Sequence, residues 1–256
     1  MDEILKYIVG IISITSIWEF IKFFYPNFLK FLRQRKEANK LLLNNISPIL
    51  ISSSELYGKL ESLSKEDFNT YINPLNSNSV NVEHNMKYVL YLFANFFGQI
   101  QLIQLQNHYS MLSSIKKGRD LLRFIEVIES RKFRIVDRSI QRIIGESMIV
   151  DSNNVYKILP MKDFFYLIET DKIFTNWIIE LDKIISSVDN KGTRQRVLVF
   201  GVIVASFIDH FDSKNQIVRR RGIYKNKLSP KSKKLIQFQL IEHYLFFLKD
   251  KKQYYK

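Results

Sequence analysis

The segment Tyr7-Ile-Val-Gly-Ile-Ile-Ser-Ile-Thr-Ser-Ile-Trp18 contains no charged residue, and the aromatic segment Phe20-Ile21-Lys22-Phe23-Phe24-Tyr25 follows it closely. Asp2 and Glu3 precede the apolar stretch, and a basic stretch comes directly after it. The basic residues are Lys30, Arg33, Arg35, Lys36 and Lys40. Membrane proteins carry an excess of Lys and Arg on the cytoplasmic side of a spanning helix. This order predicts an uncleaved membrane anchor, with the N-terminus outside and the rest of the chain in the cytoplasm.

The length of this anchor depends on how its few charges are accommodated. A spanning helix needs about 20 mostly apolar residues, and residues 4–25 reach that length only by including Lys6, Glu19 and Lys22. Lysine side chains near a helix end extend to the headgroups, and Lys22 lies on the same helix face as Glu19. The predicted anchor residues are Tyr7, Ile8, Ile11, Ile12, Ile14, Ile17, Trp18, Phe20, Ile21, Phe23 and Phe24.

Two other interpretations of the same segment stay open. One is an amphipathic helix that lies flat in the membrane interface. The other is the first core helix of a soluble bundle. A cleaved signal peptide is disfavoured, because acid precedes the apolar run, base follows it, and no small-x-small cleavage site comes before Trp18-Glu19.

The composition favours a helical protein with one well-packed domain. The 256 residues have room for an anchor and a domain of about 200 residues. With 46% hydrophobic residues, only 8 Gly and only 5 Pro, the chain is suited to helices around a core. We predict a mainly α protein, in which a single-pass anchor precedes a helical bundle with one small β hairpin. The expected parts are an anchor at 1–26, a juxtamembrane helical region at 27–72, a loop at 73–85 and a helical body at 86–256.

A second long apolar segment covers residues 86–115, and it has no formal charge from Tyr88 to Ile115. Its amide side chains are costly in hydrocarbon without partners. They are Asn95, Gln99, Gln101, Gln104, Gln106 and Asn107. We therefore interpret the segment as the central helix of a soluble bundle, with a membrane-embedded hairpin as the alternative.

Local signals predict several further elements. Apolar spacing predicts a helix over 26–62, interrupted near Pro48, and a buried helix over 194–211. Residues 133–136 resemble a short strand, and residues 148–159 a small hairpin. Ser229-Pro230 combines an N-cap residue with proline at the first helical position, which predicts the start of the last helix.

The net charge of +14 predicts an anionic partner, either the membrane surface or nucleic acid, unless it reflects only the Lys-rich composition that AT-rich genomes encode. The strongest basic run has no acid between Lys214 and Ile241. Its basic residues are Arg219, Arg220, Arg221, Lys225, Lys227, Lys231, Lys233 and Lys234. We expect this run in an exposed loop, where it contacts anionic lipid or nucleic-acid phosphates, with Tyr224 as a stacking platform. A solvated loop without a partner is the alternative.

A second basic cluster contains Arg134, Arg138 and Arg142. Arginine in a Lys-rich chain indicates bidentate binding of phosphate or carboxylate. Carboxylates lie nearby in the sequence, at Glu126, Glu129, Asp137 and Glu146. An intramolecular ion-pair network is therefore the favoured interpretation, and binding of an anionic partner is the alternative.

Signals for catalysis are weak. The absence of cysteine excludes disulfides, thiolate metal sites and cysteine nucleophiles. The chain has no Gly-rich phosphate loop, no Gly-x-Ser-x-Gly and no His-Glu-x-x-His. A metal site formed by Asp209, His210, Asp212 and His243 is a minor alternative. We predict no catalytic residue, no cofactor and no metal ligand, and we lean away from an enzyme.

These observations predict a membrane-anchored helical module for interaction, scaffolding or an effector role, with a basic cytoplasmic face. The expected partners are anionic lipid, a protein or a second copy of the chain, and nucleic acid. One alternative is a membrane-tethered protein that binds nucleic acid or nucleotides. Another is a membrane-perturbing effector that inserts the uncharged 88–115 segment.

Overall fold

The computed structural model describes the backbone of residues 2–69, 79–105, 109–153, 155–219 and 222–256, and their side chains apart from 2–21, 23 and 79–82. Within these residues the fold is mainly helical, and its two strands form one antiparallel hairpin, as predicted. The larger helices are α1 (Asp2–Lys65), α3 (Ser79–Leu105), α5 (Lys116–Glu129), α6 (Arg138–Ser147), α7 (Met161–Thr170), α8 (Lys172–Ser186) and α9 (Lys191–Phe211). The shorter elements are α4 (Tyr109–Ser113), β1 (Ile149–Ser152), β2 (Val155–Ile158), η2 (Lys225–Lys227), α10 (Pro230–Lys234), the π-helical η3 (Leu235–Tyr244) and η4 (Lys251–Tyr254).

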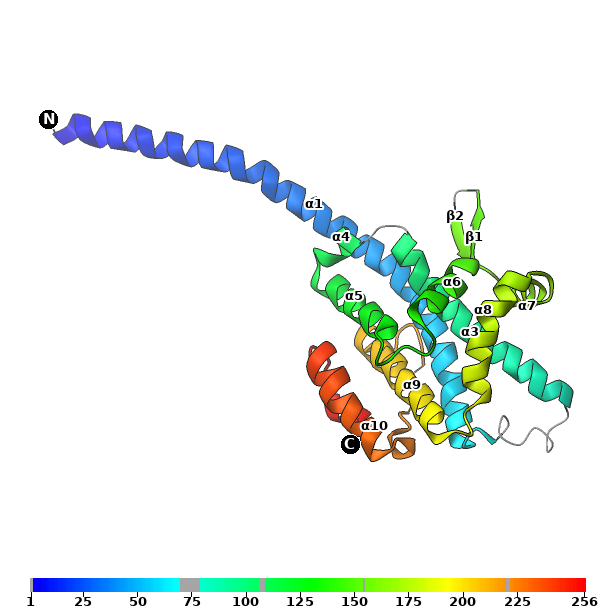
Figure 1. Ribbon diagram of the computed structural model, residues 1–256. Coiled ribbons are helices and arrows are strands. Elements are labelled where there is room, and N and C mark those ends of the chain that lie inside the picture. Colours follow the sequence, from blue (N-terminus) through cyan, green and yellow to red (C-terminus); the bar gives the residue numbers. More distant parts are fainter. Residues whose placement is uncertain (1, 70–78, 106–108, 154, 220–221) are drawn as a thin grey trace.

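The two halves of helix α1 have different surroundings. Its N-terminal half projects away from the other elements, and its C-terminal half packs between α3 and α9 (Figure 1). None of the described side chains from Lys22 to Glu37 is buried. Ala38 is the first fully buried residue, and burial continues at Leu42 and Ile46, one helical turn apart. One helix therefore connects the N-terminal apolar segment with the core.

Pro48 does not interrupt this helix, so the predicted break was wrong. Proline removes one backbone hydrogen bond and disturbs a helix by about 3 kcal/mol. Pro48 is exposed, whereas the adjacent Ile49 and Leu50 are at most 2% exposed. Each buried side chain of that size contributes about 1.5–3 kcal/mol. The burial of Ile49 and Leu50 thus offsets the lost hydrogen bond.

The apolar 86–115 segment is not one helix. α3 begins earlier, at Ser79, and ends at Leu105, and the separate helix α4 follows. Residues 79–85 of the predicted loop are therefore helical, and an ion pair between Glu83 and Lys87 (3.1 Å) stabilises that end. The rest of the predicted loop, 73–78, lies outside the described residues.

Within the described residues, α3 contains the one span that is long and apolar enough to cross a membrane, and 61% of that span is buried in the protein. Phe93, Phe96 and Phe97 of α3 pack around Phe200 of α9. The side-chain oxygens of Asn95 and Gln104 are buried and accept no hydrogen bond among the described residues. Two of the amides have partners within the protein, since Gln101 donates to Glu146 (3.0 Å) and Gln104 donates to Glu129 (2.7 Å). These contacts favour the core-helix interpretation of this segment over the membrane-embedded one.

The hairpin and α9 agree with the predictions. Ile149 pairs with Ile158 and Ser152 pairs with Val155 across β1 and β2. Residues 133–136 form a turn and not the predicted strand, because they connect α5 to α6 without a neighbouring strand to pair with.

The last helix begins where expected. The Ser229 hydroxyl accepts a hydrogen bond from the Ser232 amide (3.2 Å), and Pro230 occupies the first helical position. Beyond Lys234 the helix widens into the π-helical η3, which ends where the Leu245 amide donates to the Leu240 carbonyl (2.8 Å). This end of the chain lies at the far side of the body from the projecting part of α1 (Figure 1).

Candidate site for an anionic partner

Up to Ser229 the described part of the basic run 219–234 forms a connection between α9 and α10 that contains only the short η2, in agreement with the predicted loop. Its described cations are exposed at Lys225, Lys231 and Lys234 and half-buried at Lys227 and Lys233. Arg220 and Arg221 lie outside the described residues, and Arg219 is exposed. Lys227 pairs with Asp67 just beyond the end of α1 (2.8 Å). The run therefore follows the surface of the body near the C-terminal end of α1 and then enters α10.

Tyr224 is buried, so its predicted role as a stacking platform was wrong. Its ring is 6% exposed and stacks on Tyr57, with centroids 5.6 Å apart. Its hydroxyl donates to the Leu198 carbonyl of α9 (3.0 Å), and burial raises the pKa of this hydroxyl well above its usual value. The tyrosine holds the loop onto α9, a role that required knowledge of which helix lies beneath it.

A groove of about 960 Å³ lies between the N-terminal half of α9, the α10–η3 segment and the turn before α6. Five of its lining residues are cations, and no Asp or Glu is among the described residues that line it. The cations are Lys132, Lys191, Arg196, Lys231 and Lys234. Its apolar lining is contributed by Phe133, Val199, Leu235 and Phe238. The groove thus combines an apolar surface with uncompensated positive charge.

Gln195 holds the two sides of the groove together. Its side-chain NH2 donates to the Lys227 carbonyl (2.9 Å), and its side-chain oxygen accepts from the Ser229 amide (2.7 Å). This places the start of α10 against the first turns of α9. The lysines at 231 and 234 therefore lie across the groove from the cations of α9.

Arg196 is the most constrained cation of the groove. Its guanidinium donates twice to the Arg134 carbonyl, at 2.9 and 2.7 Å. Burial lowers the pKa of Arg196 from its usual value, and the neighbouring Arg134 cation lowers it further. Lys132 likewise contacts a neutral oxygen, that of the Gln239 side chain (2.7 Å). Positive charge in such surroundings is stabilised by a bound anion.

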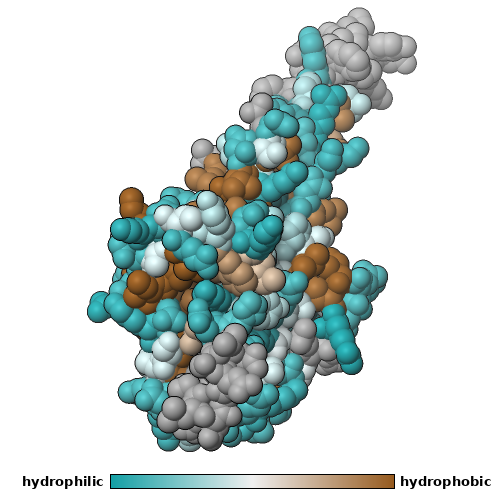
Figure 2. Space-filling model, turned by 90° about the vertical axis from the view of Figure 1, so that its right-hand side faces the viewer, coloured by the Kyte–Doolittle hydropathy of each residue, from teal (hydrophilic) through white to brown (hydrophobic). Residues whose placement is uncertain are grey.

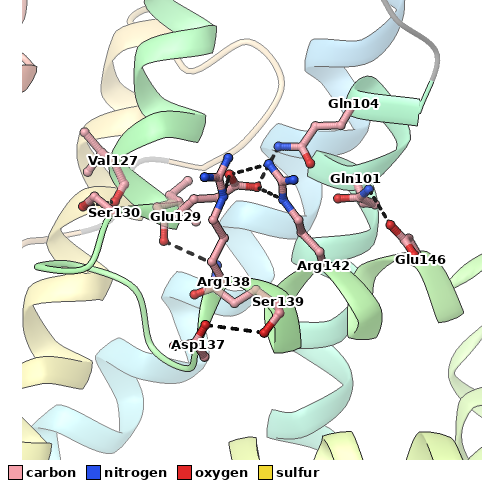
Figure 3. A network of polar contacts seen from close by, with 12 residues as sticks. Gln101, Gln104, Val127, Glu129, Ser130, Asp137, Arg138, Ser139, Arg142 and Glu146 are labelled. Carbon is pink, nitrogen blue, oxygen red and sulfur yellow. Dashed lines mark hydrogen bonds and ion pairs between the residues drawn. The ribbon is translucent and has the colours of Figure 1, made fainter.

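The second cluster has carboxylate partners within the chain. Glu129 accepts hydrogen bonds from Arg138 (2.8 Å), from Arg142 (3.0 and 2.8 Å) and from Gln104 (2.7 Å) (Figure 3). Burial raises the pKa of Glu129, but the bonds from Arg142 and Gln104 outweigh it, so the pKa lies below its usual value. Arg134 pairs with Asp137 (2.6 Å). The favoured ion-pair network is confirmed, and binding of an outside anion by these arginines stays a prediction.

The side chains of the metal-site alternative do not converge. Asp209 accepts from the Tyr254 hydroxyl (2.7 Å), and Asp212 accepts from the Gln216 amide (2.7 Å). No group of three His, Asp or Glu in the described part of the chain is arranged to hold a metal ion.

The sequence analysis did not predict one hydrogen-bonded pair, that of His210 with Asp120. Nε2 of His210 lies 3.0 Å from a carboxylate oxygen of Asp120, at a hollow of about 370 Å³. The two residues come from α9 and α5 and are far apart in the chain, so no local motif indicates them.

The predicted anchor residues from Tyr7 to Ile21, and Phe23, belong to α1, but their side chains lie outside the described ones. Phe24 is 50% exposed. Comparison of the chain with protein-family models, curated proteins and solved structures finds no match.

Proposed function

We propose that this chain is a membrane-tethered helical module, in which α1 leaves the bilayer and continues without a break into the core of a cytoplasmic body. The continuity of α1 from Asp2 to Lys65 carries this proposal. A flexible linker would leave the orientation of the body free. A single helix with its C-terminal half buried transmits the direction of the anchor to the body.

The part of α1 next to the anchor has the surface expected at a membrane interface. Tyr25, Phe28 and Phe31 are 60%, 58% and 50% exposed. Figure 2 shows a hydrophilic surface interrupted by apolar patches along the helix that projects from the body. Aromatic and cationic side chains together are favoured at the level of the headgroups. This mixture supports an interfacial position for residues 24–36.

The length of α1 bears on which partner the basic groove takes. From Tyr25 to Lys65 the helix is roughly 60 Å long at ~1.5 Å per residue. Lys227 pairs with Asp67 at the far end of this helix, and Lys227 is close to the groove. The attraction of a basic segment to anionic lipid falls off within a Debye length, about 10 Å. An upright α1 therefore supports a soluble anionic partner for the groove and not lipid.

The membrane-perturbing alternative has a high energetic cost. Insertion of α3 would remove Phe93, Phe96 and Phe97 from the core, where each is at most 3% exposed. Loss of burial costs about 1.5–3 kcal/mol for each such side chain. We therefore favour the tether.

Alkaline carbonate extraction of cell membranes tests the tether. The full chain is compared with a chain that starts at Asn27, which keeps every fully buried residue of the described structure because burial begins at Ala38. We expect the full chain in the pellet and the shorter chain in the supernatant, with the helical circular dichroism of a folded body. A full chain that is extracted into the supernatant would overturn the proposal.

The absence of cysteine permits a direct test of orientation. A cysteine is introduced as Asp2→Cys or, as the matched control, as Lys172→Cys on the exposed surface of α8. We expect a membrane-impermeant maleimide to label position 2 in intact cells and position 172 only after lysis. The reverse pattern would place the body outside and contradict the proposed topology.

A further inference from the structure

We infer that the groove between α9 and α10 binds a short segment of single-stranded nucleic acid, with phosphates on its cations and bases on its apolar lining. This inference goes beyond the membrane tether and does not rest on it. It follows from the charge of the groove, the exposure of one aromatic ring and the continuation of the basic surface beyond the groove.

The charge of the groove is not neutralised from within the chain. None of its five cations takes part in an ion pair within the part of the chain that the structure describes. They come from three segments, namely the turn before α6, the start of α9 and α10. Cations on several sides of one groove surround an anion, whereas a merely solvated helix face carries its charges on one side.

The apolar lining offers a surface for bases. Phe133 and Val199 are buried beneath the groove, at 1% and 4% exposure, and Phe238 is 51% exposed. An exposed phenyl ring beside cations is the arrangement on which bases stack while the backbone follows the positive charge. A fully hydrated anion such as free phosphate would make no use of this apolar surface.

The basic surface continues past the groove. A second hollow, of about 260 Å³, shares Lys191 and Gln195 with the groove and adds Arg194, whereas its other cation, Lys227, is paired with Asp67. Arg194 donates to the Val188 carbonyl and has no carboxylate partner among the described ion pairs. The groove volume of about 960 Å³ is also at the upper end of small-molecule sites. A chain of nucleotides fits this extent better than a single nucleotide does.

The test uses the full-length protein in detergent micelles and fluorescence anisotropy with a labelled 12-nucleotide oligouridylate. In the groove variant, Lys191, Lys231 and Lys234 are each changed to Gln. In the control variant, Lys157, Lys162 and Lys172 are each changed to Gln. All six side chains are exposed, so both variants lose the same charge from the surface.

We expect the groove variant to bind at least 10-fold more weakly than the control variant at physiological salt. Three lost phosphate contacts lower the slope of log K against log salt by about 2, at ~0.7 for each contact to a single strand. The variant with Arg in place of these three lysines keeps the affinity and the slope. Equal loss in the groove and control variants would show attraction by net charge alone and would overturn the inference.

A separate measurement tests the role of the Phe238 ring. We expect Phe238→Ala to weaken oligouridylate binding by roughly 5- to 150-fold without changing the salt slope, as the loss of base–aromatic stacking does. A polyglutamate peptide of equal charge should compete poorly. Tight binding of that peptide, unaffected by Phe238→Ala, would identify an acidic protein as the partner and overturn the inference, as would the absence of any oligouridylate binding.

Discussion

The Tyr224 side chain lies against α9 at Gly201. A Cβ atom at this position would overlap the Tyr224 hydroxyl, which in turn donates to the Leu198 carbonyl one turn earlier. The glycine is therefore needed for close approach and not for an unusual backbone conformation. This contact holds the segment before α10 in place, and with it one side of the groove.

Gly201→Ala should destabilise the protein by about 1–3 kcal/mol, the usual cost of overpacking a core. Urea unfolding followed by circular dichroism measures the change. The double variant with Tyr224→Phe lacks the clashing hydroxyl and should recover part of the stability. Additive losses in the two single variants would contradict the contact.

Glu129 is a buried carboxylate whose side chain is 8% exposed and binds two arginines. Glu129→Gln removes the charge, and we expect a loss of about 1–3 kcal/mol, as for a hydrogen-bonded charged group. Because the folded pKa of Glu129 lies below its usual value of 4.5, this stability is present above that pH and disappears as the pH falls through the folded pKa. The stability difference between wild type and variant, measured from pH 7 to pH 3, should therefore shrink at acid pH.

Protonation of His210 should also make the free energy of unfolding depend on pH, in a higher pH range than that of Glu129. Burial lowers the pKa of His210 below the usual 6.5, and the bond to Asp120 opposes this only in part. Below pH 6.5 the unfolded chain takes up a proton that the folded protein does not, so stability should fall as the pH decreases from 6.5 toward the folded pKa. Thermal unfolding of wild type and His210→Gln across this range should show the dependence in wild type alone, and an equal dependence in both proteins would assign it to other groups.

At the scale of elements, α3 and α6 pack through two glycines. A Cβ at Gly145 would lie 2.8 Å from the Phe97 carbonyl, and one at Gly98 would lie 2.9 Å from the Met148 Cβ. This close approach allows Gln101 of α3 to reach Glu146 of α6. The turn that leads into α6 lines the groove, so the contact between α3 and α6 also bears on the position of the groove.

Gly145→Ala should cost about 1–3 kcal/mol, because the backbone of α3 must move to admit the methyl group. The exposed Ser139 of the same helix provides a control, since Ser139→Ala changes only the surface and should cost under about 0.5 kcal/mol. Urea midpoints of the two variants measure the difference. Equal midpoints would show that the helices are less closely packed.

At the scale of the whole molecule, the projecting part of α1 makes no buried contact among its described side chains before Ala38. A chain that starts at Asn27 should therefore unfold at the same urea concentration as the full chain in detergent micelles. A lower midpoint for the shorter chain would show that the N-terminal segment packs on the body.

Much of the helical architecture was predictable because it depends on residues that are close in sequence. Local sequence specifies three elements, namely the helix start at Ser229-Pro230, the 148–159 hairpin and the amphipathic helix α5. The ion pairs around Glu129 were also expected, since Arg138 and Arg142 follow it by only 9 and 13 residues in the chain. Failures occurred where packing against a distant element outweighed a local preference, as at Pro48.

By itself, the sequence determined the helical class, the apolar start of α1 and the excess of positive charge, because composition and short-range periodicity specify these properties. Only the tertiary structure decided that Tyr224 is buried, that α3 lies in the core and that Lys191 and Arg196 face Lys231 and Lys234 across a groove. Each of these depends on which helices are neighbours. That arrangement is set by the burial of many side chains at once, and no single stretch of the chain contains it.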